Sequence, residues 1–239
     1  MFTRILVPID FSATSSAALT YARALASAFN ATLHLLHIAA VTFLCAGGVG
    51  SIRSRQAAMA DLDTLLGDED RQLFRATATV EYAQMPAEAI VHHALANDVE
   101  LIVMGTHGHT GLAHVLLGSV AEWVVRRAPC PVLTLRGLPR SMADGRTGPS
   151  RVLAATDFSP PSDRALEHAR RLAERCGAQL HLLHVLEDPI ETAAFATRTF
   201  VPDLPEVREA RLREAADRLA QRAGADSTPP RVTTEVVVG

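Results

Sequence analysis

The feature that most constrains this chain is an internal repeat. The segment RILVPIDFS, which begins at Arg4, recurs as RVLAATDFS from Arg151. A second segment, ATLHLLHI from Ala31, recurs as AQLHLLHV from Ala178 at the same offset of 147 residues. Because the stretch between the two segments also matches in length, the repeat indicates duplication of a whole folding unit.

The repeat sets the expected domain boundaries. Residues 1–137 are expected to form a first domain, and residues 150–239 a second one. Between them, residues 138–149 carry Gly, Pro, Ser and charged side chains without periodicity, which is typical of a linker.

Each copy opens with a strand, a helix and a second strand. In the first copy, apolar residues from Ala18 to Phe29 recur at helical spacing and predict a helix with Ser12 or Thr14 as its N-cap. The strand Thr32–Ile38 follows. A strand–helix–strand unit of this length implies parallel strands joined by a right-handed crossover.

The rest of the first copy continues this alternation after a glycine-rich loop at residues 47–50. The further expected helices are Arg53–Leu66, one that starts at Pro86, and Leu112–Arg127. The further expected strands are Thr77–Ala83, Glu100–Met104 and Pro131–Leu135. Strands separated by helices throughout predict an α/β fold with an open, doubly wound, parallel five-stranded sheet.

The second copy is a truncated version of the first. After its opening strand, helix and strand come a helix expected over Pro205–Ala223 and a third strand over Val232–Val238. The helix carries two pairs of opposite charge at i,i+4 spacing, Glu209/Arg213 and Glu214/Arg218. The counterpart of Met85–Arg136 is absent, so this copy lacks a fourth strand, a glycine loop and a fifth strand.

A glycine-rich loop follows the fourth expected strand. Gly105, Gly108, Gly118 and Ser119 fit the pattern G-x2-G-x9-G-[ST]. Two glycines after a strand are also typical of a plain turn, but the four-position spacing is rarer. In an open α/β sheet, ligands bind beyond the carboxyl ends of the strands, where glycines let backbone N–H groups approach an anion. The following helix adds the positive end of its dipole, so the pattern predicts a phosphate site.

The glycine spacing does not stand alone. Together with VPIDFS at 7–12, LLHI at 35–38 and LGSVAEWVV at 117–125, it resembles the ATP-binding type of universal stress protein. The resemblance covers nearly all of residues 1–137, but only the N-terminal half of the family domain in the second copy. It implies the strand order 3-2-1-4-5 in the first copy. The first strand of the second copy would then be an exposed apolar edge.

The resemblance also implies a ligand, ATP with or without Mg²⁺, and a role for each matching residue. Expected around the adenine and ribose are Pro8, Ile9, Asp10, Ile38, Met104 and Gly105. Expected around the phosphates are His107, Gly108, Gly118, Ser119 and Val120. The second copy keeps only Asp157 and Val185 of this set, so it is not expected to bind nucleotide by itself.

Asp10 has two interpretations. As a ligand-binding residue it would face the same crevice as the glycine loop. An Asp before a helix is also often only a cap, and the following Ser12 suits that role. Its counterpart Asp157 is interpreted as structural.

Other chemistries fit the sequence less well. A P-loop needs a lysine for the β- and γ-phosphates, and this chain has no lysine. The segment 106–109, THGH, differs at its first position from the H-x-G-H of nucleotidyl transferases and follows the fourth strand instead of the first. Three loop histidines, His107, His109 and His114, do not share one helical face, so solvated loop histidines are favoured over a metal site. No nucleophile–base arrangement is visible.

Histidines also recur in the repeat. His34 and His37 reappear as His181 and His184. Because residues three apart on a strand point to opposite faces, hydrogen bonding in the core or at the crevice edge is favoured over a shared metal.

Composition excludes several other classes. The formal charge of −3 gives no basic field for nucleic acid or an anionic membrane. Cys45, Cys130 and Cys176 have no metal-site spacing and are expected to be free thiols. No apolar run approaches the roughly 20 residues that span a bilayer, and no leader segment is evident, so a cytoplasmic location is expected.

These observations lead to one hypothesis and two alternatives. The first copy is expected to bind ATP and act as a nucleotide-dependent stress-response or signalling module with an unidentified protein partner. A nucleotide-independent interaction module is the first alternative, and an enzyme, either a slow ATPase or a transferase, is the second. The resemblance also implies that tandem members pair their two domains through the fifth strands. Because the second copy lacks a fifth strand, Pro131–Leu135 of the first copy is expected to pair with another chain in a homodimer.

Overall fold

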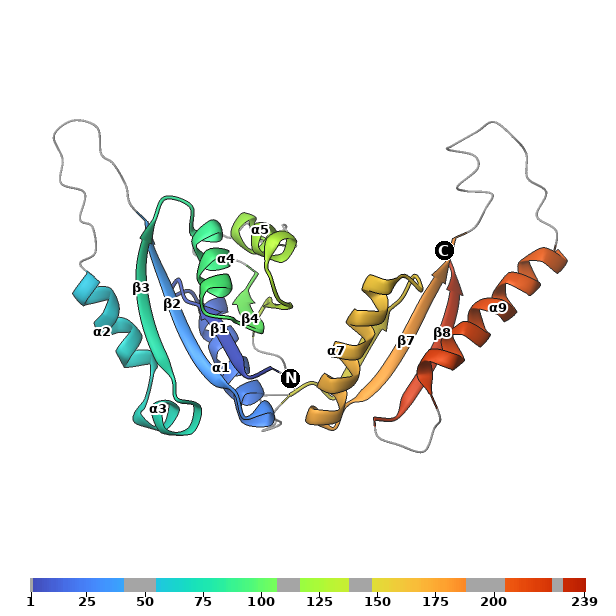
Figure 1. Ribbon diagram of the computed structural model, residues 1–239, viewed down its shortest axis with the longest axis horizontal. Coiled ribbons are helices and arrows are strands. Elements are labelled where there is room, and N and C mark those ends of the chain that lie inside the picture. Colours follow the sequence, from blue (N-terminus) through green and yellow to red (C-terminus); the bar gives the residue numbers. More distant parts are fainter. Residues whose placement is uncertain (1, 41–54, 107–116, 138–147, 188–204, 225–229) are drawn as a thin grey trace. The chain divides into compact units, whose positions relative to one another are not determined.

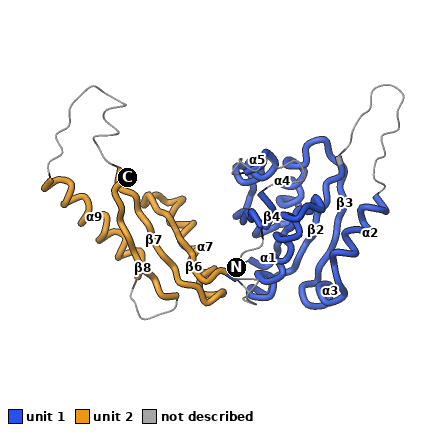
Figure 2. Tube along the Cα trace, turned by 180° about the vertical axis from the view of Figure 1, so that it is seen from behind, with its two compact units in different colours: residues 1–148 blue, residues 149–239 orange. Residues whose placement is uncertain are grey.

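The computed structural model describes residues 2–40, 55–106, 117–137, 148–187, 205–224 and 230–239. The chain divides into two compact units, residues 1–148 and 149–239 (Figure 2). Most of the expected linker and all of the expected glycine-rich loop at 47–50 lie outside the described residues.

Unit 1 is a five-stranded parallel sheet with helices on both faces (Figure 1). The strands are β1 (Arg4–Pro8), β2 (Thr32–Ala40), β3 (Thr77–Ala83), β4 (Leu101–Gly105) and β5 (Val132–Leu135). The helices are α1 (Ala13–Phe29), α2 (Arg55–Leu65), α3 (Asp68–Phe74), α4 (Pro86–Ala96) and α5 (Ser119–Arg127). The strand order β3-β2-β1-β4-β5 confirms the expected doubly wound topology.

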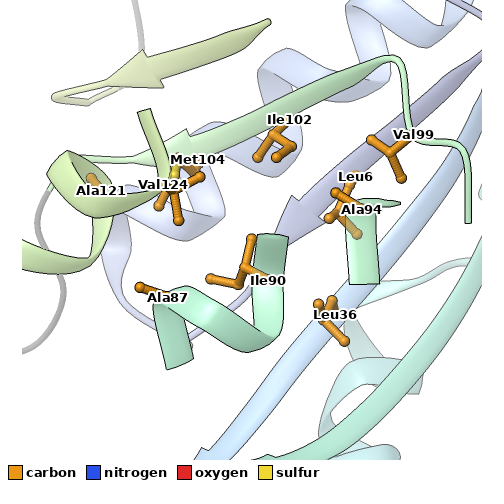
Figure 3. Close-up of a cluster of buried hydrophobic side chains, with 10 residues drawn as sticks. All are labelled: Leu6, Leu36, Ala87, Ile90, Ala94, Val99, Ile102, Met104, Ala121 and Val124. Carbon is orange, nitrogen blue, oxygen red and sulfur yellow. The ribbon is translucent and has the colours of Figure 1, made fainter. Parts of the chain in front are cut away.

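Strand β1 lies at the centre of this sheet and contributes to both layers of the core. It pairs in parallel with β2 through Leu6↔His34 and with β4 through Leu6↔Ile102. Leu6 packs with Leu36, Ile102 and the apolar sides of α4 and α5 in a buried cluster (Figure 3). Its neighbours Ile5 and Val7 are buried on the opposite face, where α1 contacts the strand. A central strand buried on both faces explains the continuous apolar run.

The N-cap of α1 is Ser12, one of the two candidates expected from the sequence. Its backbone is extended, at φ −78° and ψ 163°, and its Oγ accepts a hydrogen bond from the amide of Ser15 at 3.2 Å. Thr14, the other candidate, lies in the first turn and its Oγ1 is 3.0 Å from Ser12 Oγ. The hydroxyl of Ser12 therefore satisfies one of the helix's unpaired N–H groups.

Helix α3 was not expected from the sequence. It is short and polar, and it is held to α1 by an ion pair in which Arg23 donates from Nε and Nη2 to Asp70 at 2.9 and 2.6 Å. Arg23 also donates to the carbonyl oxygen of Leu65 at 2.6 Å. A tertiary contact of this kind leaves no periodic apolar signal in the sequence.

Within the described residues, the expected helix Leu112–Arg127 is helical only from Ser119. Residues 107–116 lie outside the described residues, but Gly118 is extended, at φ −70° and ψ 157°, and acts as the N-cap of α5. The expectation that one helix runs through Gly118 is therefore wrong.

Unit 2 is a three-stranded parallel sheet in the order β6-β7-β8. Its elements are β6 (Arg151–Ala155), α7 (Pro160–Cys176), β7 (Gln179–Leu186), α9 (Pro205–Ala223) and β8 (Val232–Val238). Among the strands that the structure describes, β6 pairs only with β7, so it is an edge strand, as the truncated repeat predicts.

One face of the unit 2 sheet carries the core. Leu180 and Leu182 of β7 pack with Leu166 of α7 and Leu219 of α9 in a buried cluster. On the strands, alternate side chains point the other way. Leu153 of β6 is 62% exposed there.

Helix α9 confirms one of its two expected charge pairs. Arg213 donates to Glu209 at 2.5 Å. Arg218, which was expected to pair with Glu214, lies instead over the ring of Phe158, 4.2 Å from the ring centre.

The remaining sequence expectations concern membranes and cysteines. No helix within the described residues is long and apolar enough to cross a membrane. Cys130 and Cys176 are free and half-buried, as expected, while Cys45 lies outside the described residues. Burial raises the pKa of the Cys130 thiol to about 11.

Candidate functional site

The candidate site lies at the carboxyl ends of the neighbouring strands β1 and β4. Because the two strands are parallel and in register, Pro8–Asp10 and Met104–Thr106 lie at the same edge of the sheet. Pro8 is half-buried, Ile9 is buried and Asp10 is exposed. Met104 is buried within the core cluster, and Gly105 is half-buried.

A tight turn connects β1 to α1. Asp10 Oδ1 accepts a hydrogen bond from the amide of Ser12 at 3.0 Å, as in an Asx turn. Between them, Phe11 adopts φ 64°, a left-handed conformation that costs a non-glycine residue about 1–2 kcal/mol. Ser12, and not Asp10, is the helix cap, so Asp10 shapes the turn while its side chain stays at the surface.

Strand β2 passes beside this turn and holds it. The amide of Ile9 donates to the carbonyl oxygen of Leu36 at 2.8 Å. His37 Nδ1 lies 2.7 Å from the carbonyl oxygen of Ile9, and the His37 ring packs on Phe11 with 4.7 Å between ring centres. Ile38, the next residue, is half-buried and does not end the strand as expected, because β2 continues to Ala40 in its ladder with β3. The end of β1 and the adjoining part of β2 are therefore joined by direct contacts.

Gly105 lets the end of β4 approach α1 closely. A Cβ at this position would lie 2.8 Å from Thr14 Oγ1 and 2.9 Å from the Thr14 backbone carbonyl carbon. Side-chain carbons essentially never come so close to a backbone atom, so the packing requires glycine. Gly105 is thus fixed by the first turn of α1, a requirement separate from any ligand.

Thr106 brings the start of α5 to the end of β4. Its amide donates to the carbonyl oxygen of Leu135 at 2.8 Å, and its own carbonyl oxygen accepts from the amide of Gly118 at 2.7 Å. Since the Gly118 amide is used in this way, it is not one of the groups that could hold an anion.

The first turn of α5 has the character of an anion site. Its N-cap is Gly118, which supplies no side-chain hydrogen bond to the turn. Ser119 and Val120 follow and are exposed. The first N–H groups of a helix have no partner within it, and the helix dipole favours negative charge there. Ser119 and Val120 amides, with the Ser119 hydroxyl, are therefore suited to a phosphate.

The structure therefore brings together nine of the eleven expected site residues at one edge of the sheet. They are Pro8, Ile9, Asp10, Ile38, Met104, Gly105, Gly118, Ser119 and Val120. His107 and Gly108 lie outside the described residues, as do His109 and His114. Within the described part of the chain, no group of three or more His, Cys, Asp or Glu side chains could hold a metal ion.

Two residues of this edge, Thr14 and Thr106, were not expected to contribute to it. For His37, hydrogen bonding in the core or at the crevice edge was expected, and its Nδ1 does bond to the Ile9 carbonyl oxygen at this edge. The recurrence of His37 as His184, directly before a matched strand end, was the one available signal for a local role.

Unit 2 repeats the turn without the rest of the site. Asp157 Oδ1 accepts from the Ser159 amide at 2.9 Å, and Phe158 adopts φ 65°. His184 Nδ1 lies 2.8 Å from the carbonyl oxygen of Thr156, and its ring packs on Phe158 at 4.3 Å. The hydrogen bonds from Ser159 and then Ser162 lower the pKa of Asp157 to about 2. Asp157 is thus a structural residue of the turn.

The strand order β3-β2-β1-β4-β5, with helices on both faces of the sheet, defines a doubly wound α/β protein in which α5 begins at the carboxyl edge of the sheet. The chain belongs to the universal stress protein family, whose pattern it matches over residues 1–136 and again over 149–239. The two matches confirm the expected tandem arrangement.

Individual relatives agree with this assignment. Universal stress protein YxiE of Bacillus subtilis is 34% identical over 149 residues, which are 57% of this chain and all of YxiE. Universal stress protein MJ0531 of Methanocaldococcus jannaschii is 31% identical over 148 residues, or 57% of this chain and 83% of that protein. Universal stress protein Rv2005c of Mycobacterium tuberculosis is 37% identical over 94 residues, which are 39% of this chain and only 31% of its own length.

A solved structure extends the likeness over both units. The crystal structure of a universal stress protein from Archaeoglobus fulgidus is 23% identical, with a TM-score of 0.61. The match covers 99% of this chain and 77% of the other. At this identity, the likeness concerns the fold alone.

Proposed function

We propose that unit 1 binds ATP at the carboxyl edge of its sheet and acts as a nucleotide-dependent stress-response or signalling module. The observation that carries the proposal is an unbroken series of contacts along this edge. Asp10 bonds to Ser12, Ser12 contacts Thr14, and Thr14 packs on Gly105. Thr106 then bonds to Gly118 at the start of α5. This series of contacts, called the rim below, connects the proposed base end to the proposed phosphate end and so supports the proposal.

Each end of the rim suits one part of the nucleotide. Asp10, whose carboxylate is exposed, is proposed to accept from the ribose hydroxyls, and the backbone at Ile9 and Ile38 to border the adenine. The phosphates are proposed to lie on the first turn of α5, against Ser119 and Val120. ATP with Mg²⁺ would add a cation between the phosphates, held by water and phosphate oxygens.

The first experiment asks whether nucleotide is present. Purified protein is denatured and the released small molecules are identified by mass spectrometry. Titration calorimetry of nucleotide-free protein then compares ATP, AMP and GTP. The proposal expects adenine nucleotide to co-purify or ATP to bind, with AMP weaker because it makes fewer phosphate contacts.

The second experiment tests the phosphate end. Gly118→Val places a branched side chain at the N-cap of α5, at φ and ψ values that valine tolerates. ATP binding is expected to weaken at least about tenfold, equivalent to about 1.4 kcal/mol. Gly137→Val is the control, because no described atom lies within 4 Å of a Cβ at Gly137. Equal ATP affinity in both variants would refute the phosphate assignment.

Two other functions remain as alternatives. A nucleotide-independent interaction module would bind no adenine nucleotide in either experiment. A slow ATPase would release phosphate from bound ATP over hours. Binding without phosphate release is the outcome that our proposal expects.

The proposed assembly is a homodimer through residues 131–135. Among the strands that the structure describes, β5 pairs only with β4, so it is an edge strand of the unit 1 sheet and is proposed to pair through its outer backbone groups. Sedimentation velocity over a range of protein concentrations tests this proposal. A monomer at high concentration would refute it, and a dimer lost on Leu133→Pro would support it.

A further inference from the structure

We propose that His37 is a positioning residue for the adenine end of the site, a role that rests on the proposed function of unit 1. His37 acts through the backbone of Ile9 and through Phe11. Its Nδ1 lies 2.7 Å from the Ile9 carbonyl oxygen, and its ring packs on Phe11 at 4.7 Å between centres, tilted by 53°.

The hydrogen bond lies just beyond the last residue pair of the β1–β2 ladder, although β2 itself continues to Ala40. The last ladder partners of β1 and β2 are Pro8 and Leu36. Ile9, the next residue, is held through both of its polar backbone groups, since its amide donates to Leu36 and its carbonyl oxygen accepts from His37. Asp10 and Ile38 each come directly after one of these clamped residues. His37 therefore fixes the distance between the two segments proposed to border the base.

The ring contact holds the turn itself. Phe11 has a positive φ of 64°, which side chains with a Cβ adopt only when surrounding contacts enforce it. The His37 ring is one of these contacts. Because Phe11 follows Asp10 directly, loss of the contact would let the turn relax and would move the Asp10 carboxylate.

The chemistry of the bond defines which substitutions preserve it. A carbonyl oxygen only accepts, so Nδ1 of His37 must carry the proton. The side-chain amide nitrogen of asparagine lies near the position of Nδ1, whereas the amide nitrogen of glutamine lies near that of Nε2. Asparagine can thus keep the donor without the ring, and phenylalanine keeps a ring without the donor.

Unit 2 supplies a matched control. His184 makes the same two contacts, with the Thr156 carbonyl oxygen at 2.8 Å and with the ring of Phe158 at 4.3 Å. Unit 2 as described has no counterpart of β4 or α5, so no phosphate site is proposed there. A substitution at His184 therefore removes the same two contacts in a unit without a proposed nucleotide site.

The experiment measures binding and stability for four single variants: His37→Phe, His37→Asn, His37→Gln and His184→Phe. Calorimetry uses AMP, ATP and inorganic tripolyphosphate as probes, and circular dichroism verifies the fold. His37→Phe is expected to weaken AMP and ATP about tenfold, the scale of one hydrogen bond between a side chain and the backbone, and to leave tripolyphosphate unchanged. His37→Asn is expected to restore most of the AMP affinity, while His37→Gln does not.

The outcomes separate the possible failures. Equal nucleotide affinities in His37→Phe, His184→Phe and the wild type would overturn the positioning role. If His37→Phe does not fold, equal AMP affinities in the Asn and Gln variants would overturn it. A wild-type protein that binds none of the three probes would instead refute the proposed function, and this inference with it. Histidine ¹⁵N spectra of the wild type should show the proton of His37 on Nδ1, and a proton on Nε2 alone would contradict the hydrogen bond.

Discussion

Leu6 and Leu153 occupy the same position in the two repeats, yet Leu6 is completely buried and Leu153 is 62% exposed. Leu6 belongs to a buried cluster that also includes Ile90 of α4 and Val124 of α5. Unit 2 has no described helix on the corresponding face of its sheet. Identical residues in nearly identical strands therefore differ in what they contribute to stability.

Alanine substitutions should separate the two leucines. Leu6→Ala is expected to destabilise unit 1 by about 2–5 kcal/mol, because it removes buried methyl groups and leaves a cavity. Leu153→Ala is expected to cost less than about 0.5 kcal/mol, because its side chain is mostly in water already. Urea unfolding followed by circular dichroism measures both. The fluorescence of Trp123, the chain's one tryptophan, reports on unit 1 separately. Comparable losses for the two variants would contradict this account.

The contact between Gly105 and Thr14 gives a second prediction. Gly105→Ala places a methyl group 2.9 Å from the backbone of Thr14, so α1 or the end of β4 must shift. We expect a loss of about 1–3 kcal/mol in the free energy of unfolding, together with weaker ATP binding. Gly137→Ala serves as the control, since its new Cβ meets open space. A Gly105→Ala variant as stable as Gly137→Ala would show that the packing is looser than described.

The ion pair between Arg23 and Asp70 is expected to contribute far more to the free energy of unfolding than the surface ion pairs do. Asp70 is buried, so Arg23→Ala would leave a buried carboxylate without its cation and is expected to cost about 3 kcal/mol. Arg213→Ala breaks an exposed pair with Glu209 and is expected to cost less than about 0.5 kcal/mol. Thermal and urea unfolding measure the difference. A double-mutant cycle with Asp70→Ala then isolates the coupling between the two side chains.

In the turn between β6 and α7, the Asp157 carboxylate should stay ionised to a lower pH than an ordinary aspartate. Hydrogen bonds from Ser159 hold the pKa of Asp157 at about 2, below the ordinary value of about 4. The carboxylate therefore adds stability above about pH 4, and this contribution is lost as the pH falls from about 4 through 2. Carboxyl ¹³C shifts measured against pH should place the Asp157 midpoint near 2. An ordinary midpoint in the wild type would show that the turn does not form in solution, and Ser159→Ala should move the midpoint upward.

Much of the fold could be predicted because its elements carry periodic or repeated patterns. Strand Thr77–Ala83 and helix Pro205–Ala223 have the expected bounds, since apolar spacing and the flanking proline define them locally. Helix α3 could not be predicted, because an ion pair with a residue far along the chain stabilises it. The expected helix through Gly118 was wrong, because Gly118 has an extended backbone and acts as the N-cap of α5.

The candidate site was predictable to a similar extent. The glycine spacing and the strand order were sufficient to expect Asp10, Gly105 and Gly118 at one edge of the sheet. The contacts that join this edge were not, because His37 of β2 reaches Ile9 at the end of the adjacent strand β1 and Thr106 accepts from the start of α5. Such contacts depend on the distance between two backbone segments in the folded protein. Residue types and their spacing along the sequence do not predict that distance.

The single ladder of β6 has a consequence for solvent access. The amide of Thr156 donates to β7, so by alternation the amides of Val152 and Ala154 face β7 and that of Leu153 faces away. In β1, the equivalent amide of Leu6 faces β4. Hydrogen–deuterium exchange should therefore be slow at Leu6 and fast at Leu153, with slow and fast amides alternating along β6. The exchange rates of equivalent amides would thus distinguish β1, which has a described strand on each side, from β6, which has one on one side only.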